Sequence, residues 1–126
     1  MTDINSYTGK QYDFETYNCW THVCAVRSDA GLQTQMFTAS TPAIQDIAEA
    51  FNAAIEKGDH GMRQVKSPRN YDVVLAYQVF KGRPVWHAGV YYDDWVSHCH
   101  KPSGMVVFEP LSDMMQAFKG VEFWRG

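Results

Sequence analysis

One cysteine and two histidines have the side chains that nucleophilic chemistry requires, and these are Cys19, His87 and His98. A thiol that attacks a carbonyl needs an imidazole to take its proton, and the other imidazole nitrogen needs a partner that fixes its tautomer. We interpret Cys19 as the candidate nucleophile, His87 as the candidate base and His98 as its orienting partner. Taken singly, each is better explained as a core thiol or an ordinary strand histidine. Taken together, the three favour the chemical interpretation.

The position of Cys19 at the predicted start of a helix supports this interpretation. Asn18 is a good N-cap residue, and Gly31 is a plausible stop. Between them, apolar residues recur at helical spacing, namely Cys19, Val23, Val26 and Ala30. Exposed amide N–H groups and the helix dipole at such a start favour a thiolate. We therefore expect the pKa of Cys19 to be lowered.

The two histidines fall on a predicted hairpin whose strands are Val85 to Tyr92 and Trp95 to Cys99, joined by Asp93-Asp94. A two-residue turn pairs residues whose numbers sum to 187, which places Gly89 opposite His98 and His87 opposite His100. Because Gly89 has no side chain, His98 can lean toward His87, a diagonal neighbour at about 7 to 8 Å.

The rest of the chain predicts an α+β domain in which helices precede an antiparallel sheet. Besides the elements above, we expect helices over Pro42 to Lys57 and Pro110 to Phe118, and strands over Met62 to Lys66, Asp72 to Val79, Met105 to Phe108 and Val121 to Trp124.

Composition limits the classes of function. A length of 126 residues predicts a single domain, residues 1–126, and the net charge of -3 with scattered basic residues argues against nucleic-acid binding. The sequence has no long apolar run and no basic, apolar N-terminus, so we expect neither a membrane span nor a signal peptide. The cysteines Cys19, Cys24 and Cys99 are interpreted as free thiols made in a reducing compartment.

Short motifs in this order resemble the NlpC/P60 family of papain-like cysteine peptidases, especially its phage-tail members. Gly9-Lys10-Gln11-Tyr12 and Asn18-Cys19-Trp20-Thr21-His22-Val23 are similar to the family's G-K-P-Y and D-C-W-G-L-V. Asp72-Val73-Val74-Leu75 and His87-Ala88-Gly89-Val90-Tyr91 are similar to its G-D-V-V-L and H-V-G-I-Y. Ser97-His98-Cys99 stands where the family has its second histidine. The resemblance covers residues 9 to 112.

The resemblance implies a papain-like NlpC/P60 fold with Cys19 as nucleophile, His87 as general base and His98 as the residue that orients it. It also implies that Tyr12 borders the oxyanion site, with the Cys19 backbone N–H as the other donor, and that no cofactor or metal is used. The implied reaction is hydrolysis of amide bonds in peptidoglycan stem peptides, typically the D-glutamyl to diamino-acid bond. The expected partners are that peptide substrate and phage tail-tip proteins. A chain made in the cytoplasm would reach the periplasmic cell wall as part of a phage tail, or through a secretion device or lysis.

The chain departs from the family pattern at several positions. Asn18 replaces an aspartate, and Thr21 and Tyr71 replace glycines. The segment from Tyr12 to Cys19 is also shorter than in most members. These departures bear on the substrate subsite more than on the chemistry.

Other functions remain open from the sequence. The same fold could serve as a catalytically weak structural or plug protein of a phage tail tip. A zinc protein is a further alternative, since Cys19 and His22 have ligand-like spacing, although the alternating faces of His98, Cys99 and His100 argue against convergence on one ion. Lipid acyltransferases of related fold place histidine before cysteine, unlike this chain. His22 is interpreted as solvated or locally hydrogen-bonded, and His60 as a surface residue.

Overall fold

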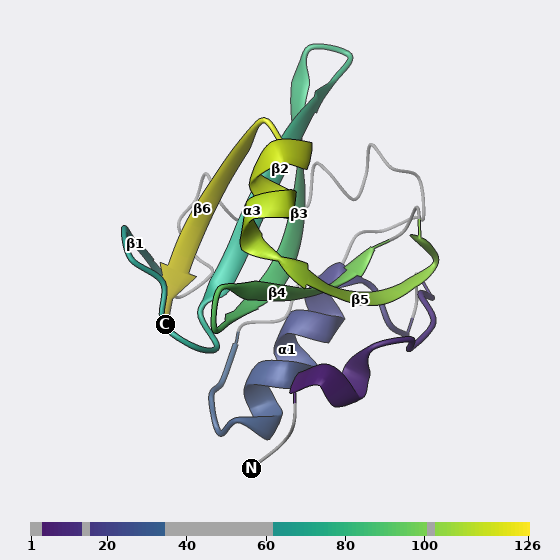
Figure 1. The fold of residues 1–126 in the computed structure, drawn as a ribbon, viewed down its shortest axis with the longest axis vertical. Helices are drawn as coiled ribbons and strands as arrows, with labels where there is room; N and C mark the ends of the chain where they lie inside the picture. The colour runs from purple at the N-terminus through teal and green to yellow at the C-terminus, as the bar shows by residue number, and fades with distance from the viewer. Residues whose placement is uncertain (1–3, 14–15, 35–61, 101–102) are drawn as a thin grey trace.

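The computed structural model describes residues 4–13, 16–34, 62–100 and 103–126. Within them, a six-stranded antiparallel sheet in the order β1-β6-β2-β3-β4-β5 is flanked by helices, so the predicted α+β class is confirmed (Figure 1). The elements are η1 (Ile4–Tyr7), α1 (Cys19–Asp29), β1 (Arg63–Val65), β2 (Val73–Phe80), β3 (Arg83–Tyr92), β4 (Trp95–His100), β5 (Met105–Pro110), α3 (Leu111–Ala117) and β6 (Gly120–Arg125). The predicted helix over Pro42 to Lys57 and the loop with His60 lie outside the described residues.

Helix α1 begins at Cys19 because Asn18 caps it, as predicted. The Asn18 side chain accepts the backbone N–H groups of Trp20 and Thr21 at 3.1 and 3.0 Å. Thr21 completes a capping box by accepting the Asn18 backbone N–H at 2.7 Å. Thr21, which departs from the family motif, thus fixes the helix start that carries Cys19.

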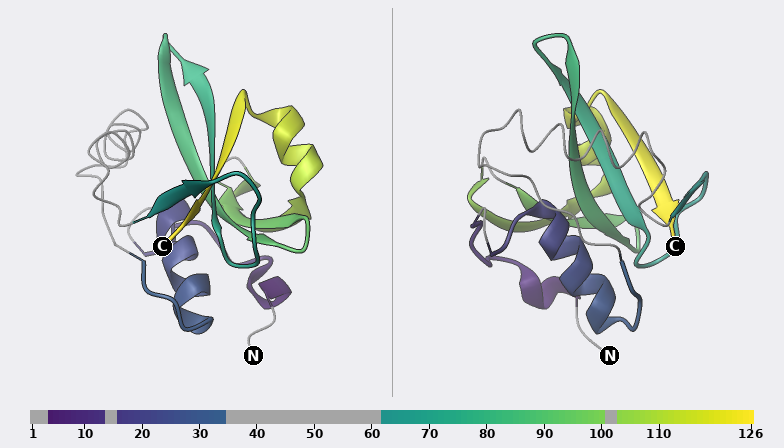
Figure 2. Two further views of the ribbon diagram at one scale, coloured as in Figure 1. Left: turned by 90° about the vertical axis from the view of Figure 1, so that its left-hand side faces the viewer. Right: turned by 180° about the vertical axis from the view of Figure 1, so that it is seen from behind.

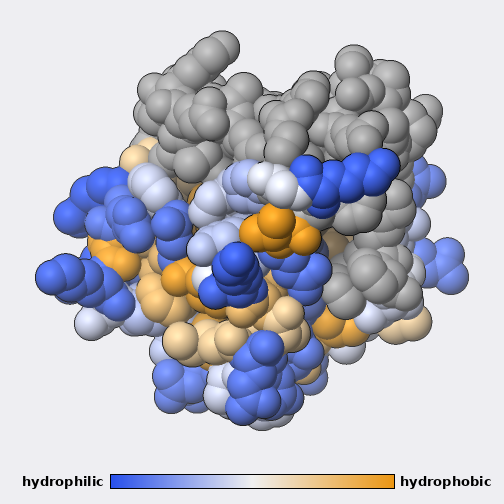
Figure 3. Space-filling model, turned by 90° about the horizontal axis from the view of Figure 1, so that it is seen from above, coloured by the Kyte–Doolittle hydropathy of each residue, from blue (hydrophilic) through white to orange (hydrophobic). Residues whose placement is uncertain are grey.

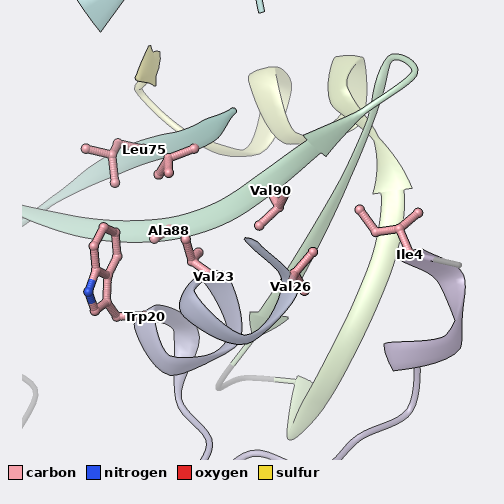
Figure 4. Packing of buried hydrophobic residues seen from close by; sticks show 8 residues of the cluster. Ile4, Trp20, Val23, Val26, Leu75, Ala88 and Val90 are labelled. Carbon is pink, nitrogen blue, oxygen red and sulfur yellow. The ribbon is translucent and has the colours of Figure 1, made fainter. Parts of the chain in front are cut away.

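The side of the sheet that faces α1 holds the larger part of the core. Trp20, Val23 and Val26 of the helix pack against alternate residues of two central strands, together with Ile4 of η1 (Figure 4). Those strand residues are Val73, Leu75, Ala88 and Val90. Because side chains alternate along a strand, every second residue of β2 and β3 points toward α1.

The intervening residues of these strands face α3, which lies on the opposite side of the sheet (Figure 2). Met114 of α3 is fully buried there, and it packs with residues of three strands, namely Val74, Ala76, Tyr91 and Val96. The predicted helix over Pro110 to Phe118 is therefore confirmed, with these two residues as its caps.

The hairpin of β3 and β4 has the predicted turn and register. Asp93 and Asp94 adopt φ angles of 50° and 68°, the left-handed pair that a two-residue turn of type I′ requires. Cross-strand pairing then follows the sum of 187 for Val90 with Ser97, Tyr91 with Val96 and Tyr92 with Trp95.

The hydrogen-bonded ladder between β3 and β4 ends at Val90 and Ser97, whereas β3 continues along β2 to Arg83. Gly89 still lies against His98, since a Cβ at Gly89 would be 3.0 Å from the His98 Cβ. The expectation that His87 pairs with His100 is wrong, because the ladder has stopped before that point.

The segment before α1 is held on the outer edge of β5. The Gly9 N–H donates to the Val106 carbonyl at 2.9 Å, the Val106 N–H to the Lys10 carbonyl at 2.7 Å, and the Tyr12 N–H to the Gly104 carbonyl at 2.9 Å. This extra pairing fixes Tyr12 near the start of α1.

The described surface mixes hydrophobic and hydrophilic residues. Viewed from the end toward which the β2–β3 hairpin points, hydrophobic residues lie in small groups between hydrophilic ones on the described part of the surface (Figure 3). None of the helices in the described ranges has the length and hydrophobicity needed to span a bilayer.

Candidate active site

The rings of His87 and His98 meet directly. Nε2 of His87 and Nδ1 of His98 are 2.7 Å apart, and the rings are nearly perpendicular at 75°. The His98 side chain is buried, with 1% of its surface exposed. On its other side, His87 stacks on Phe118 at the end of α3, with ring centroids 5.8 Å apart and an interplanar angle of 3°. Packing therefore fixes the orientation of both imidazoles.

A carboxylate that the sequence did not indicate completes this chain of contacts. Glu109 Oε1 lies 2.8 Å from Nε2 of His98, and the Glu109 side chain is 35% exposed. The pairing of Val96 with Glu109 and of His98 with Val107 places Glu109 on the same face as His98 and diagonal to it. The sequence predicted a strand that ended at Phe108 and gave no register between this strand and β4. The contact of Glu109 with His98 was therefore not predicted.

The sulfur of Cys19 lies against the backbone of β3. The N–H groups of Ala88, Trp20 and Cys19 itself hydrogen-bond to the sulfur and lower its pKa, but burial outweighs them and raises the pKa to about 11. The expectation of a lowered pKa is therefore wrong. Desolvation of the thiolate exceeds the effect of the helix start.

The direction of the Ala88 N–H shows where the sulfur sits. Tyr91 donates its N–H to the Asp72 carbonyl at 2.9 Å and accepts from the Tyr71 N–H at 2.8 Å, both on the β2 side. Backbone groups alternate along an antiparallel strand, so Ala88 directs its N–H to the other side, toward β4. The β3–β4 ladder has ended before Ala88, and the Ala88 N–H interacts with the Cys19 sulfur.

Cys19 and His87 come from different sides of the sheet. Cys19 packs with the core under α1, while the His87 ring lies on the α3 side against Phe118. The sulfur contacts the amide of Ala88, the residue directly after His87. The Cys19 sulfur therefore lies beside the backbone that follows His87, while the His87 ring lies on the α3 side of the sheet.

Tyr12 lies within electrostatic range of Cys19. Burial raises the pKa of the Tyr12 phenol, and the negative charges of Cys19 and then Cys99 raise it further. The phenol therefore keeps its proton at neutral pH and can act as a hydrogen-bond donor. Tyr12 belongs to the part of the structure that surrounds the nucleophile candidate.

The structure decides between the two alternatives given for His22 and favours the hydrogen-bonded one. Its side chain is fully buried, so the solvated alternative is wrong. Nδ1 is 2.7 Å from the Tyr17 hydroxyl and Nε2 is 2.9 Å from Ser97 Oγ, which ties α1 to β4. Burial, followed by the charges of His98 and Lys10, lowers the pKa of His22 to about 4. His22 is a neutral structural link, with both ring nitrogens already hydrogen-bonded.

The other two cysteines are free thiols. Cys99 is fully buried and donates to the Tyr17 carbonyl at 3.5 Å, and Cys24 is partly buried. Among the residues that the structure describes, no three His, Cys, Asp or Glu side chains are arranged to hold a metal ion.

Comparison with known proteins gives no match to a family model, a curated protein or a solved structure.

Proposed function

We propose that this protein is a cysteine hydrolase with the papain-like architecture of the NlpC/P60 peptidases. Cys19 is the nucleophile, His87 the general base and His98 the residue that orients His87. The observation that carries the proposal is the contact of 2.7 Å between the two imidazoles, together with the interaction of the Cys19 sulfur with the amide of Ala88, the residue after His87. The expected substrate is a peptidoglycan stem peptide, cleaved between D-glutamate and the diamino acid.

The reaction follows from the roles of these groups. His87 Nε2 is engaged with His98, so Nδ1 takes the Cys19 proton as the sulfur bonds to the carbonyl carbon. The carbonyl electron pair moves to oxygen, which accepts hydrogen bonds from the Cys19 N–H and the Tyr12 hydroxyl, each contributing about 3 kcal/mol. The C–N bond then breaks, and His87 returns the proton to the departing amine.

Water completes the cycle. His87 takes a proton from the water as its oxygen attacks the thioester carbon. The C–S bond breaks, the free carboxylic acid leaves, and the proton returns to Cys19. No oxidant, metal or cofactor enters the balance of these steps.

The raised pKa of Cys19 defines how the nucleophile is activated. With a pKa of about 11, about one sulfur in 10⁴ is ionised at pH 7 in the absence of a base. Proton transfer to His87 therefore accompanies the attack on the carbonyl. The reaction then depends on His87 more strongly than it would with a preformed thiolate.

The test uses purified protein and soluble muropeptides, with product analysis by chromatography and mass spectrometry. We expect cleavage by the wild-type protein, and loss of cleavage in Cys19→Ala. The matched control is Cys24→Ala, which removes a partly buried thiol of the same helix and should retain turnover. Equal cleavage by wild type and Cys19→Ala would contradict the proposal.

The raised pKa of Cys19 favours one alternative, a plug or structural protein of a phage tail tip with little activity. Such a protein would keep the fold and the buried contacts without turning over substrate. Negligible cleavage by both wild type and Cys19→Ala, across stem peptides of different diamino acids, would support this alternative. Copurification with tail-tip proteins is consistent with either role and does not separate the two.

A further inference from the structure

We infer that Glu109 is a positioning residue that sets the tautomers of both imidazoles and so leaves Nδ1 of His87 as the basic nitrogen. The inference rests on the proposed function for its catalytic meaning. Its structural basis is two consecutive hydrogen bonds, one between Glu109 and His98 and one between His98 and His87.

The direction of the chain begins at the carboxylate. An ionised carboxylate only accepts hydrogen bonds, so the contact of 2.8 Å with Glu109 requires a proton on Nε2 of His98. A neutral imidazole carries one N–H, which makes Nδ1 of His98 an acceptor. The His98 ring is 1% exposed, so water has little access to offer it a different partner.

The contact between His98 and His87 then determines the tautomer of His87. Nδ1 of His98 is 2.7 Å from Nε2 of His87. This hydrogen bond between two neutral rings needs one proton, carried by one of the two nitrogens. Since Nδ1 of His98 accepts, Nε2 of His87 donates, and Nδ1 of His87 carries no proton. That nitrogen is then able to take the thiol proton.

Without the carboxylate, the contact between the two imidazoles also permits a second arrangement. In it, His98 donates from Nδ1 and His87 accepts at Nε2, so His87 carries its proton on Nδ1 and cannot act as the base. Glu109 selects between the two arrangements. It also stabilises the positive charge that develops on the His87 imidazole during the reaction, because the negative carboxylate polarises the hydrogen bonds that lead to that ring.

The test is ¹⁵N NMR of protein labelled at the histidine ring nitrogens, at a pH where the rings are neutral. Protonated and bare nitrogens give well-separated resonances, and His87→Asn and His98→Asn assign the signals. We expect the wild-type protein to show a proton on Nε2 and a bare Nδ1 in both rings. In Glu109→Gln the amide can accept or donate, so we expect the tautomers of both rings to redistribute. Glu122→Gln, on β6, is the matched control and should leave the resonances of both rings unchanged.

The outcomes separate this inference from the proposed function. A wild-type His87 protonated on Nδ1, or unchanged tautomers in Glu109→Gln, would overturn it, and the first result needs no variant. The expected tautomers without muropeptide cleavage would leave the inference standing and refute the hydrolase. Where cleavage occurs, Glu109→Gln should lower kcat by about 10- to 100-fold, the size of effect seen when the carboxylate partner of a metal-ligating histidine is removed. Glu109→Asp, which keeps the carboxylate, should recover part of that loss.

Discussion

The buried His22 makes the stability of this protein depend on pH in a defined window. Burial and the charges of His98 and Lys10 lower the pKa of His22 from 6.5 to about 4 in the folded state. The unfolded chain therefore binds more protons than the folded chain between these values, so stability rises with pH across the window. The contribution is fully present above pH 6.5 and is lost as the pH falls to about 4. Each pKa unit corresponds to about 1.4 kcal/mol, so the total loss is about 3 kcal/mol.

The perturbation is His22→Gln, which removes the titrating group and retains one amide to contact Tyr17 or Ser97. Glutamine cannot reproduce both imidazole contacts, so we expect the variant to be less stable at pH 8 by about 1 to 3 kcal/mol. Urea unfolding at intervals between pH 4 and pH 8 gives the free energy of unfolding of each protein. The stability of the wild type relative to the variant should fall by about 3 kcal/mol toward pH 4, so that the wild type is no longer the more stable protein there.

Subtracting the free energy of unfolding of His22→Gln from that of the wild type at each pH removes the contributions of all groups that titrate alike in both proteins. Lys10→Gln provides a graded control, because removing this charge should raise the His22 pKa toward its ordinary value and reduce the pH dependence. A difference between wild type and His22→Gln that stays constant from pH 8 to pH 4 would refute the reasoning. It would mean that His22 is not a buried neutral group in solution.

Three further substitutions test other parts of the structure. Gly89→Ala should destabilise the protein by about 1 to 3 kcal/mol in urea unfolding, because the new Cβ would lie 3.0 Å from the Cβ of His98; an unchanged midpoint would contradict this packing. Asn18→Ala should cost about 1 kcal/mol by removing the cap of α1, as measured by thermal unfolding, and an unaltered melting temperature would contradict the capping box. Asp72→Asn should lower the urea midpoint, since Asp72 is 4% exposed and accepts hydrogen bonds from the Arg125 guanidinium at 3.0 and 2.7 Å; a midpoint equal to that of the wild type would show that this ion pair contributes nothing.

Local signals in the sequence predicted the parts of the site that depend on neighbouring residues. Asn18 marked the start of α1 because a side-chain cap acts within a few residues. Asp93-Asp94 marked the hairpin because a two-residue turn fixes the register of both strands. That register was sufficient to bring His87 and His98 together, although the pairing ended earlier than expected.

Features that depend on distant packing could not be predicted in the same way. The register of β4 with β5 is not set by a two-residue turn, so Glu109 gave no sign that it reaches His98. The pKa of Cys19 depends on how much of the protein surrounds the sulfur, and the burial that raises it comes from tertiary contacts. His22 looked like a polar helix residue, and only the contact of α1 with β4 shows that it is fully buried. The position of β6 between β1 and β2 is likewise a long-range pairing.

Formation of a thioester on Cys19 tests the central claim most directly. The protein would be mixed with a soluble stem-peptide fragment, quenched in acid within the first turnover, digested and mapped by mass spectrometry. The account predicts an acyl group on the peptide that contains Cys19, absent from Cys19→Ala and absent from the peptides that contain Cys24 or Cys99. Cleavage of the fragment at an equal rate in wild type and Cys19→Ala, with no adduct on Cys19, would contradict it.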